Sequence, residues 1–203
     1  MADVIKIHQC FPTVINEFKL DIPVHDNIQM LNYINLIKNT NDNVSVNQTE
    51  DTLYNLSFFK YFKDNILDLH KEILDGLGYE YEDILITNMW GNISEVGDIH
   101  PPHTHSNNFF SGVFYLQADE QASSIHFTDP RPQASVLVPR RKQNNLYNSN
   151  ILGFSAKEGI GFIFPSWLQH WVPATGSERI SISWNIMVKG HYGEPTQLQN
   201  AYI

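Results

Sequence analysis

The sequence is poor in three features that would otherwise define its setting: cysteine, long apolar runs and basic residues. Cys10 is the single cysteine, so no intrachain disulfide can form and the fold does not depend on an oxidising compartment. No stretch approaches the roughly 18 consecutive apolar residues that span a bilayer. The first residues also lack the basic and apolar regions of a signal peptide. We therefore predict a soluble, cytoplasmic protein that does not enter a membrane.

Positive charge is scarce, with 13 Lys and Arg against 22 Asp and Glu, which gives a formal net charge of −9. Such a chain has no general attraction for nucleic-acid phosphates, so we expect no nucleic-acid partner. The one local basic cluster consists of Arg131, Arg140, Arg141 and Lys142. Its surroundings, residues 139–150, are polar, which is typical of a solvated loop and also suits a substrate lid.

The two halves of the chain follow different patterns. Residues 1–82 combine an alternating stretch at 14–22 with a strongly amphipathic helix. The apolar positions of that helix, from Phe59 to Ile73, recur at intervals of three and four until Gly76 and Gly78 interrupt them. Between them, the polar residues 39–51 predict a surface loop. We interpret this half as a strand and a layer of helices packed on a sheet, within one domain of residues 1–203.

From residue 84 onward the pattern changes to short strands separated by turn residues, which predicts a jelly-roll core over 84–188. The fold class is therefore mainly β with flanking helices. The expected strands are 84–93, 109–118, 123–128, 135–138, 160–165, 170–173 and 178–188.

Histidines are concentrated within this predicted core. His103 and His105 are two residues apart, so on an extended strand both side chains point to the same face. A third imidazole from a distant strand would complete a facial metal site, and His170 is placed to provide it. His100 lies just outside the pair, where a solvent-facing or supporting role suits it better.

The strand predicted at 178–188 has two unlike faces. Ile180, Ile182 and Trp184 share one face, whereas Arg179 and Ser181 lie on the other. If the apolar face packs outward against other layers, Arg179 points into the barrel. A guanidinium there is costly unless an anion meets it, and a carboxylate suits its planar geometry.

Several motifs occur together in a characteristic order: Phe11-Pro12-Thr13, His103-Thr104-His105, Ser111 to Leu116, Asp129-Pro130-Arg131, Phe164 to Trp167 and Glu178 to Ser181. In this combination the chain resembles a bacterial and phage family of 2-oxoglutarate-Fe(II) oxygenases of unassigned substrate. The resemblance is strong over 84–188 and weak before it. It implies a double-stranded β-helix that uses Fe(II), 2-oxoglutarate and O₂, releases succinate and CO₂, and hydroxylates an unidentified primary substrate.

The resemblance also implies roles for individual residues. His103, His105 and His170 would bind the iron, and Arg179 would bind the distal carboxylate of 2-oxoglutarate, with Ser181 and Tyr115 assisting. For Tyr115, a place in the core is an equal alternative.

Most members of the wider superfamily carry an acidic residue where this chain has His105. Asp98 or Asp129 therefore remains open as a metal ligand. Two further functions also remain open: a three-histidine, cupin-like dioxygenase that does not use 2-oxoglutarate, and a non-catalytic jelly-roll binding or virion-associated module. A homodimer is equally open.

Overall fold

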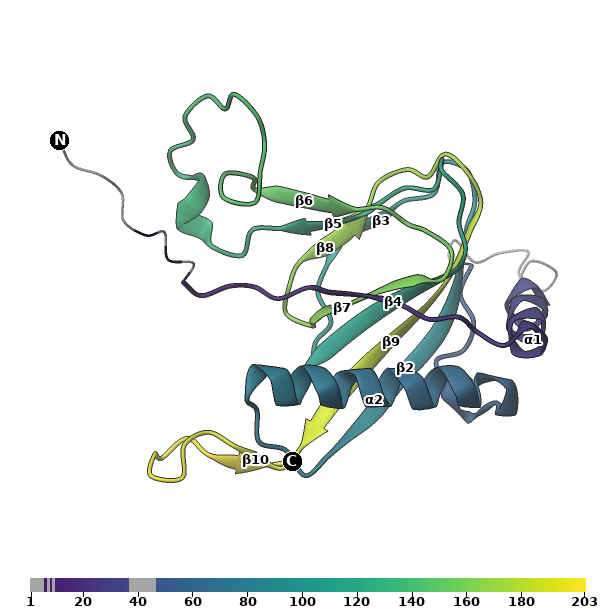
Figure 1. The fold of residues 1–203 in the computed structure, drawn as a ribbon, viewed down its shortest axis with the longest axis horizontal. Coiled ribbons are helices and arrows are strands. Elements are labelled where there is room, and N and C mark those ends of the chain that lie inside the picture. The colour runs from purple at the N-terminus through teal and green to yellow at the C-terminus, as the bar shows by residue number, and fades with distance from the viewer. Residues whose placement is uncertain (1–5, 7, 9, 37–46) are drawn as a thin grey trace.

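The structure, a computed structural model, describes residues 6, 8, 10–36 and 47–203. Its centre is a five-stranded antiparallel sheet (Figure 1). The strand order is β1-β7-β4-β9-β2, with bounds Asn16–Lys19, Ile160–Pro165, Phe110–Gln117, Arg179–Lys189 and Asp83–Ser94. The long pairing of β2 with β9 brings residues almost a hundred positions apart side by side.

A second, four-stranded sheet forms the other layer. Its order is β3-β8-β5-β6, with bounds His100–His103, His170–Val172, Ile125–Thr128 and Ile151–Phe154. From β2 to β9 the chain passes repeatedly from one sheet to the other, except at β5 and β6, which are antiparallel neighbours in the four-stranded sheet. This winding is that of a double-stranded β-helix. The predicted fold class is thus confirmed. A small hairpin of β10 (His191–Tyr192) and β11 (Ala201–Tyr202) follows.

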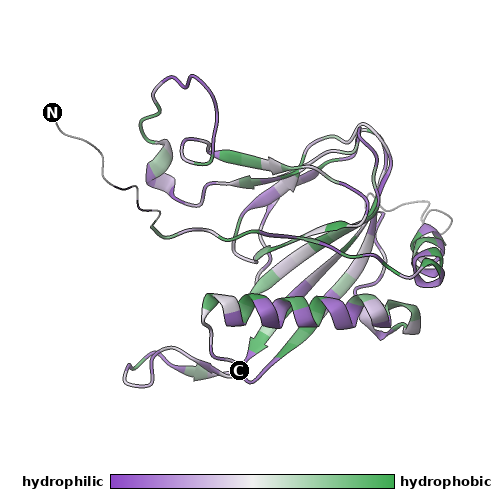
Figure 2. Ribbon diagram, viewed as in Figure 1, coloured by the Kyte–Doolittle hydropathy of each residue, from purple (hydrophilic) through white to green (hydrophobic). Residues whose placement is uncertain are grey.

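Two helices cover the outer face of the five-stranded sheet. They are α1 (Val24–Asn35) and α2 (Lys60–Leu77). Two short 3₁₀ helices, η2 (Leu53–Asn55) and η3 (Ser57–Phe59), lie between them in the sequence and lead into α2. α2 is the helix predicted from its apolar spacing, and it ends at Gly78 in the left-handed conformation (φ 76°) that favours glycine. Figure 2 shows apolar and polar residues alternating along it. No helix of the described residues is long and apolar enough to cross a membrane.

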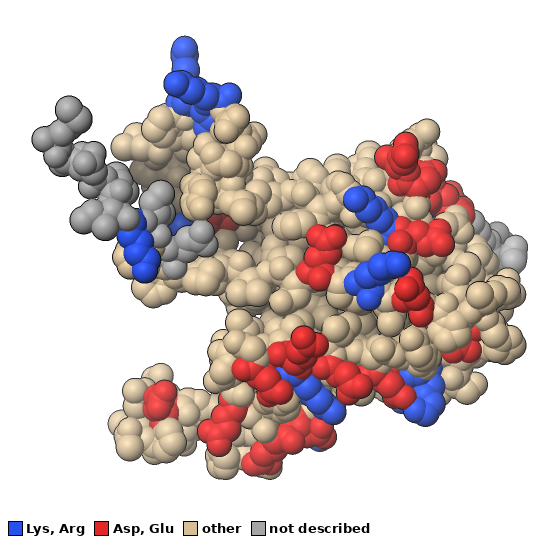
Figure 3. Space-filling model, viewed as in Figure 1, with Lys and Arg blue, Asp and Glu red and all other residues tan. Residues whose placement is uncertain are grey.

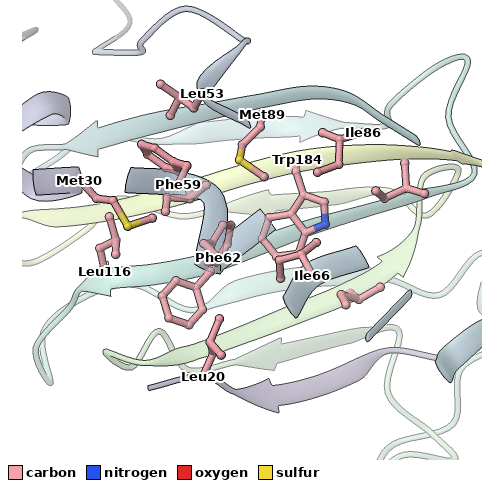
Figure 4. Close-up of a cluster of buried hydrophobic side chains, with 14 of the residues drawn as sticks. Leu20, Met30, Leu53, Phe59, Phe62, Ile66, Ile86, Met89, Leu116 and Trp184 are labelled. Atoms are coloured by element: carbon pink, nitrogen blue, oxygen red, sulfur yellow. The ribbon is translucent and has the colours of Figure 1, made fainter. Parts of the chain in front are cut away.

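The larger core fills the space between these helices and the five-stranded sheet (Figure 4). Trp184 lies at its centre, fully buried, with the ring of Phe62 packed edge-on at 5.5 Å. Gly112 on β4 is required here, because a Cβ atom would lie 2.2 Å from the Trp184 ring. β9 therefore turns its apolar face toward the helices, as predicted.

A second core lies between the two sheets. It includes Tyr115, Ile125, Phe127, Phe164 and Leu168. Because successive side chains of a strand point to opposite faces, one set of residues on β4 and β9 packs into the core beneath the helices. The alternate set points into the space between the two sheets. The polar face of β9 is therefore enclosed between the sheets.

Three sequence predictions need correction. No strand occupies 135–138, where the 3₁₀ helix η4 (Pro132–Ser135) leads into a loop. The strand expected to carry both His103 and His105 is shorter than predicted, because β3 ends at His103; it is an edge strand, where Pro101 and Pro102 are tolerated. Of the loop predicted at 39–51, residues 39–46 lie outside the described residues, whereas Gln48 forms a bridge to Asn92 on β2.

Candidate metal and cosubstrate site

Three histidines meet between the sheets. His103 ends β3, His170 begins β8, and the two are direct partners in the antiparallel register. His105 follows two residues later and is not part of a strand, contrary to the prediction, although its ring still reaches the same point. One ligand nitrogen from each ring lies within 4.8 Å of the others, and Nε2 of His105 is 3.3 Å from Nε2 of His170.

Backbone carbonyls orient two of these rings. Nδ1 of His103 lies 2.8 Å from the carbonyl oxygen of Pro101, and Nδ1 of His170 lies 2.9 Å from that of Leu168. Because a carbonyl oxygen only accepts, both Nδ1 atoms carry the proton and donate it. Each Nε2 therefore keeps its lone pair, which is the arrangement that metal-binding histidines show.

Burial keeps the imidazoles neutral. Desolvation, together with a smaller effect of His103 nearby, lowers the pKa of His105 to about 4. Desolvation likewise lowers the pKa of His170 to about 3, against the opposing effect of its bond to Leu168. Neutral imidazoles are the form that binds metal, so the cluster is ready to accept a cation at neutral pH.

Arg179 lies at the other end of the same cavity. It is 3% exposed, and its Nη atoms donate to the carbonyl oxygen of Ser123 (3.2 Å) and to Oγ of Ser94 (3.1 Å). Its Nε is buried without a hydrogen-bond partner, and no carboxylate of the described residues pairs with it. Burial lowers its pKa, as expected for a cation that lacks an anion. Arg179 can therefore donate hydrogen bonds to a negatively charged group in this cavity.

Tyr115 and Ser181 complete this end of the cavity. They are opposite each other on β4 and β9, and both line the space between His170 and Arg179. The Tyr115 hydroxyl is buried without a partner, and burial raises its pKa to about 12 although Arg179 acts in the other direction. The phenol consequently keeps its proton and can donate it to a bound oxygen.

Neither acidic candidate for the metal site reaches it. Asp98 accepts a hydrogen bond from the backbone of Glu95 (2.8 Å), outside the cavity. Asp129 makes a two-point contact with Arg131 at 3.0 and 2.8 Å. Among the described residues, the histidine triad is the one group with metal-ligand geometry.

Sequence reasoning missed a polar row along the cavity wall. Nε2 of Gln48 donates to Oδ1 of Asn92 (2.7 Å), and Nδ2 of Asn92 donates to Oγ of Ser183 (3.2 Å). All three residues line the cavity. The sequence alone favours a structural hydrogen-bonding role for Asn92, although its face of the strand also suits a cavity wall, and it places Gln48 in a surface loop. His100 also lines the cavity, where burial and Arg179 lower its pKa.

Comparison with known sequences identifies one matching family, described as "Putative 2OG-Fe(II) oxygenase", which aligns with residues 88–185. That segment runs from β2 to β9 and contains all three histidines, Tyr115, Arg179 and Ser181. No curated protein matches the chain.

Several solved structures share the fold. A prolyl-4-hydroxylase from Pseudomonas putida superposes with a TM-score of 0.59 at 13% identity, covering 86% of this chain and 88% of that one. The viral collagen prolyl hydroxylase of Paramecium Bursaria Chlorella virus-1, in complex with 2-oxoglutarate, gives 0.54 at 13%, covering 85% and 94%. The epimerase SnoN, with Fe³⁺, α-ketoglutarate and nogalamycin RO, gives 0.61 at 11%, covering 94% and 81%. At such low identity these likenesses establish the fold alone.

Proposed function

We propose that the chain, which matches the 2OG-Fe(II) oxygenase family over residues 88–185, is an Fe(II)- and 2-oxoglutarate-dependent enzyme that hydroxylates a C–H bond of its primary substrate. When bound, the iron supplies the oxidation, in which O₂ and 2-oxoglutarate yield succinate, CO₂ and one oxygen atom for the substrate. The chain's own residues hold, orient and shield the reactants.

We propose that His103, His105 and His170 are the iron ligands. The observation that fits is the shared point of their nitrogens, with Nε2 lone pairs freed by the carbonyl contacts at Nδ1. Three neutral imidazoles on one side leave the opposite positions open for a chelating cosubstrate and a gas.

The single observation that carries the 2-oxoglutarate assignment is the incomplete pairing of Arg179. A buried guanidinium costs several kcal/mol if left without an anion. A carboxylate between Arg179 and Tyr115 would accept from the free Nε and from the orphaned hydroxyl, and Ser181 adds a further polar group beside them. A dianion also balances a cationic site whose three imidazole ligands bring no charge.

Metal binding is tested by isothermal titration of Fe(II) without oxygen. His103→Ala and His170→Ala should each abolish stoichiometric binding, whereas His191→Ala, on the exposed β10–β11 hairpin, should bind as the wild type does. Full iron occupancy in both cavity variants would show that the ligands were chosen wrongly.

Cosubstrate use is tested on the same iron-loaded protein. Adding 2-oxoglutarate should produce a metal-to-ligand charge-transfer band, and admitting O₂ should convert 2-oxoglutarate to succinate. A three-histidine dioxygenase that does not use 2-oxoglutarate would give neither signal, and a non-catalytic module would give no succinate.

Five further properties remain predictions from the sequence: a single domain over 1–203, a bacterial or phage source, a cytoplasmic location, the absence of a nucleic-acid partner, and a homodimer as one open oligomeric state. Cell fractionation tests the location, and light scattering of the purified protein tests the oligomeric state.

A further inference from the structure

A second cavity, of about 400 Å³, lies on the open side of the sandwich. Its walls come from His8 and Cys10 and from side chains within the segments 11–15, 128–131 and 146–152. Its floor is formed by Phe127 and Leu168, which belong to the core between the sheets. Both touch a histidine of the metal site: the ring of Phe127 lies 6.0 Å from that of His170, and the Leu168 carbonyl accepts from it. The cavity therefore adjoins the metal site but has its own lining.

The cavity opens where two sheets end. β6 is the last strand of the four-stranded sheet and contributes Leu152, and β1 is the last strand of the five-stranded sheet, with Ile15 just before it. Among the described residues, no strand pairs with the outer edge of β6. An edge strand presents unpaired N–H and C=O groups, which another extended chain can satisfy.

The rim of the cavity combines exposed apolar side chains with positive charge. Phe11 and Leu146 are 94% and 75% exposed although both line it. Arg141 donates to the side chain of Asn150 (2.6 Å), which also lines the cavity, and this bond ties the basic loop to the rim.

The charges of this loop are not neutralised. Arg140, Arg141 and Lys142 form no ion pair with any described residue, whereas Arg131 is already held by Asp129. Figure 3 shows basic side chains at the tip of the loop that extends from the body, while acidic side chains gather over α2. In a chain of net charge −9, this is a locally positive surface.

We propose that this cavity binds an extended, acidic peptide segment of a partner protein, which adds as a strand to β6. The free strand edge points to a polypeptide, because backbone pairing is the one interaction here that only another chain can supply. The apolar floor suits one large side chain of the peptide. The cations at 140–142 suit acidic residues that flank this large side chain in the peptide. A nucleic acid or an anionic membrane would bind these cations but would not use the strand edge or the apolar floor.

The test begins with a displayed library of random peptides about ten residues long, enough to span the strand and the basic loop. Selection on the wild-type protein should enrich peptides that are net acidic and carry a central large apolar residue. The dissociation constant of an enriched synthetic peptide is then measured by fluorescence anisotropy, without metal, so the result does not depend on the oxygenase reaction.

Two variants and one control identify the site. Arg140→Glu/Lys142→Glu should weaken binding by about tenfold or more, since attraction at two rim positions becomes repulsion. Lys71→Glu/Lys189→Glu makes the same change of charge at exposed positions on α2 and β9 and should leave affinity unchanged. Thr13→Trp, on the exposed wall, fills the cavity and should abolish binding without disturbing a core residue.

Hydrogen exchange distinguishes strand addition from binding elsewhere. Saturating peptide should slow the exchange of backbone amides in Ile151–Phe154. Three results would overturn the proposal: selected peptides with no acidic bias, equal affinity of the wild type and Arg140→Glu/Lys142→Glu, or unchanged exchange in β6 at saturation. Preferential binding of an oligonucleotide or of anionic vesicles over the peptide would assign the surface to another partner.

Discussion

Arg179→Lys is the substitution that most sharply separates a cosubstrate-binding arginine from a structural one. A guanidinium has five N–H donors, and in this structure one bond goes to Ser123 and one to Ser94, so three donors remain. An ammonium group has three donors in total. If a lysine kept the bonds to Ser123 and Ser94, one donor would remain for a carboxylate, and the planar two-point contact would be lost.

The magnitude follows from the lost contact. One charge-assisted hydrogen bond contributes about 1.5–3 kcal/mol, which corresponds to a dissociation constant for 2-oxoglutarate roughly ten- to a hundredfold higher. Iron affinity should be nearly unchanged, because Arg179 contacts none of the three histidines.

The assay is an anaerobic titration of the Fe(II) protein with 2-oxoglutarate, followed by the charge-transfer band. Arg141→Lys, on the exposed loop, is the matched control and should titrate as the wild type does. If Arg179→Lys and the wild type titrate identically, Arg179 is structural and the reasoning from its unpaired Nε fails.

Three further predictions concern the ligand set and the core. His105→Asp should retain iron and turnover in the Fe(II) titration and succinate assay, because it restores the commoner carboxylate ligand; loss of iron would contradict this. Gly112→Ala should lower the free energy of unfolding in urea by about 1–3 kcal/mol, because its Cβ would overlap Trp184, whereas Gly76→Ala, with open space around it, should not destabilise the fold. Burial lowers the pKa of His70 to about 4 from 6.5, so the free energy of unfolding should fall by up to about 3 kcal/mol as the pH falls from 6.5 toward 4. In urea unfolding of the metal-free proteins, His70→Leu should lose less stability over this pH range than the wild type. Equal pH dependence of the two proteins would refute the prediction.

Periodicity was sufficient to predict much of the fold. The two-residue alternation in β9 placed Ile180 and Trp184 on one face and Arg179 on the other, and the structure has them so. The helical spacing from Phe59 to Ile73 predicted α2 equally well, because a long amphipathic segment has one way to bury its apolar face.

The errors arose where tertiary contacts override local preference. The strand that carries His103 ends earlier than predicted, at His103 itself. β6 was not predicted, because its four residues, Ile151–Phe154, are too few and alternate too irregularly to indicate a strand. Gln48 could not be found from the sequence, because its place in the cavity depends on pairing with Asn92, 44 residues away.

The histidine pair was predicted for an incomplete reason. His105 does not lie on a strand with His103, yet its backbone N–H donates to the carbonyl of Ser166 (2.9 Å), in the segment that leads to His170. The convergence of the three rings thus depends on long-range packing, which the two-residue spacing could not reveal.

The most direct test of the account is a crystal structure of the protein determined without oxygen, with Fe(II) and 2-oxoglutarate bound. We expect one iron ion with a nitrogen of His103, His105 and His170 each at about 2.0–2.2 Å, as is typical of imidazole–metal bonds. The distal carboxylate of 2-oxoglutarate should pair with Arg179 and accept from the Tyr115 hydroxyl. Iron bound away from the three histidines, or 2-oxoglutarate bound without contact to Arg179, would contradict the account.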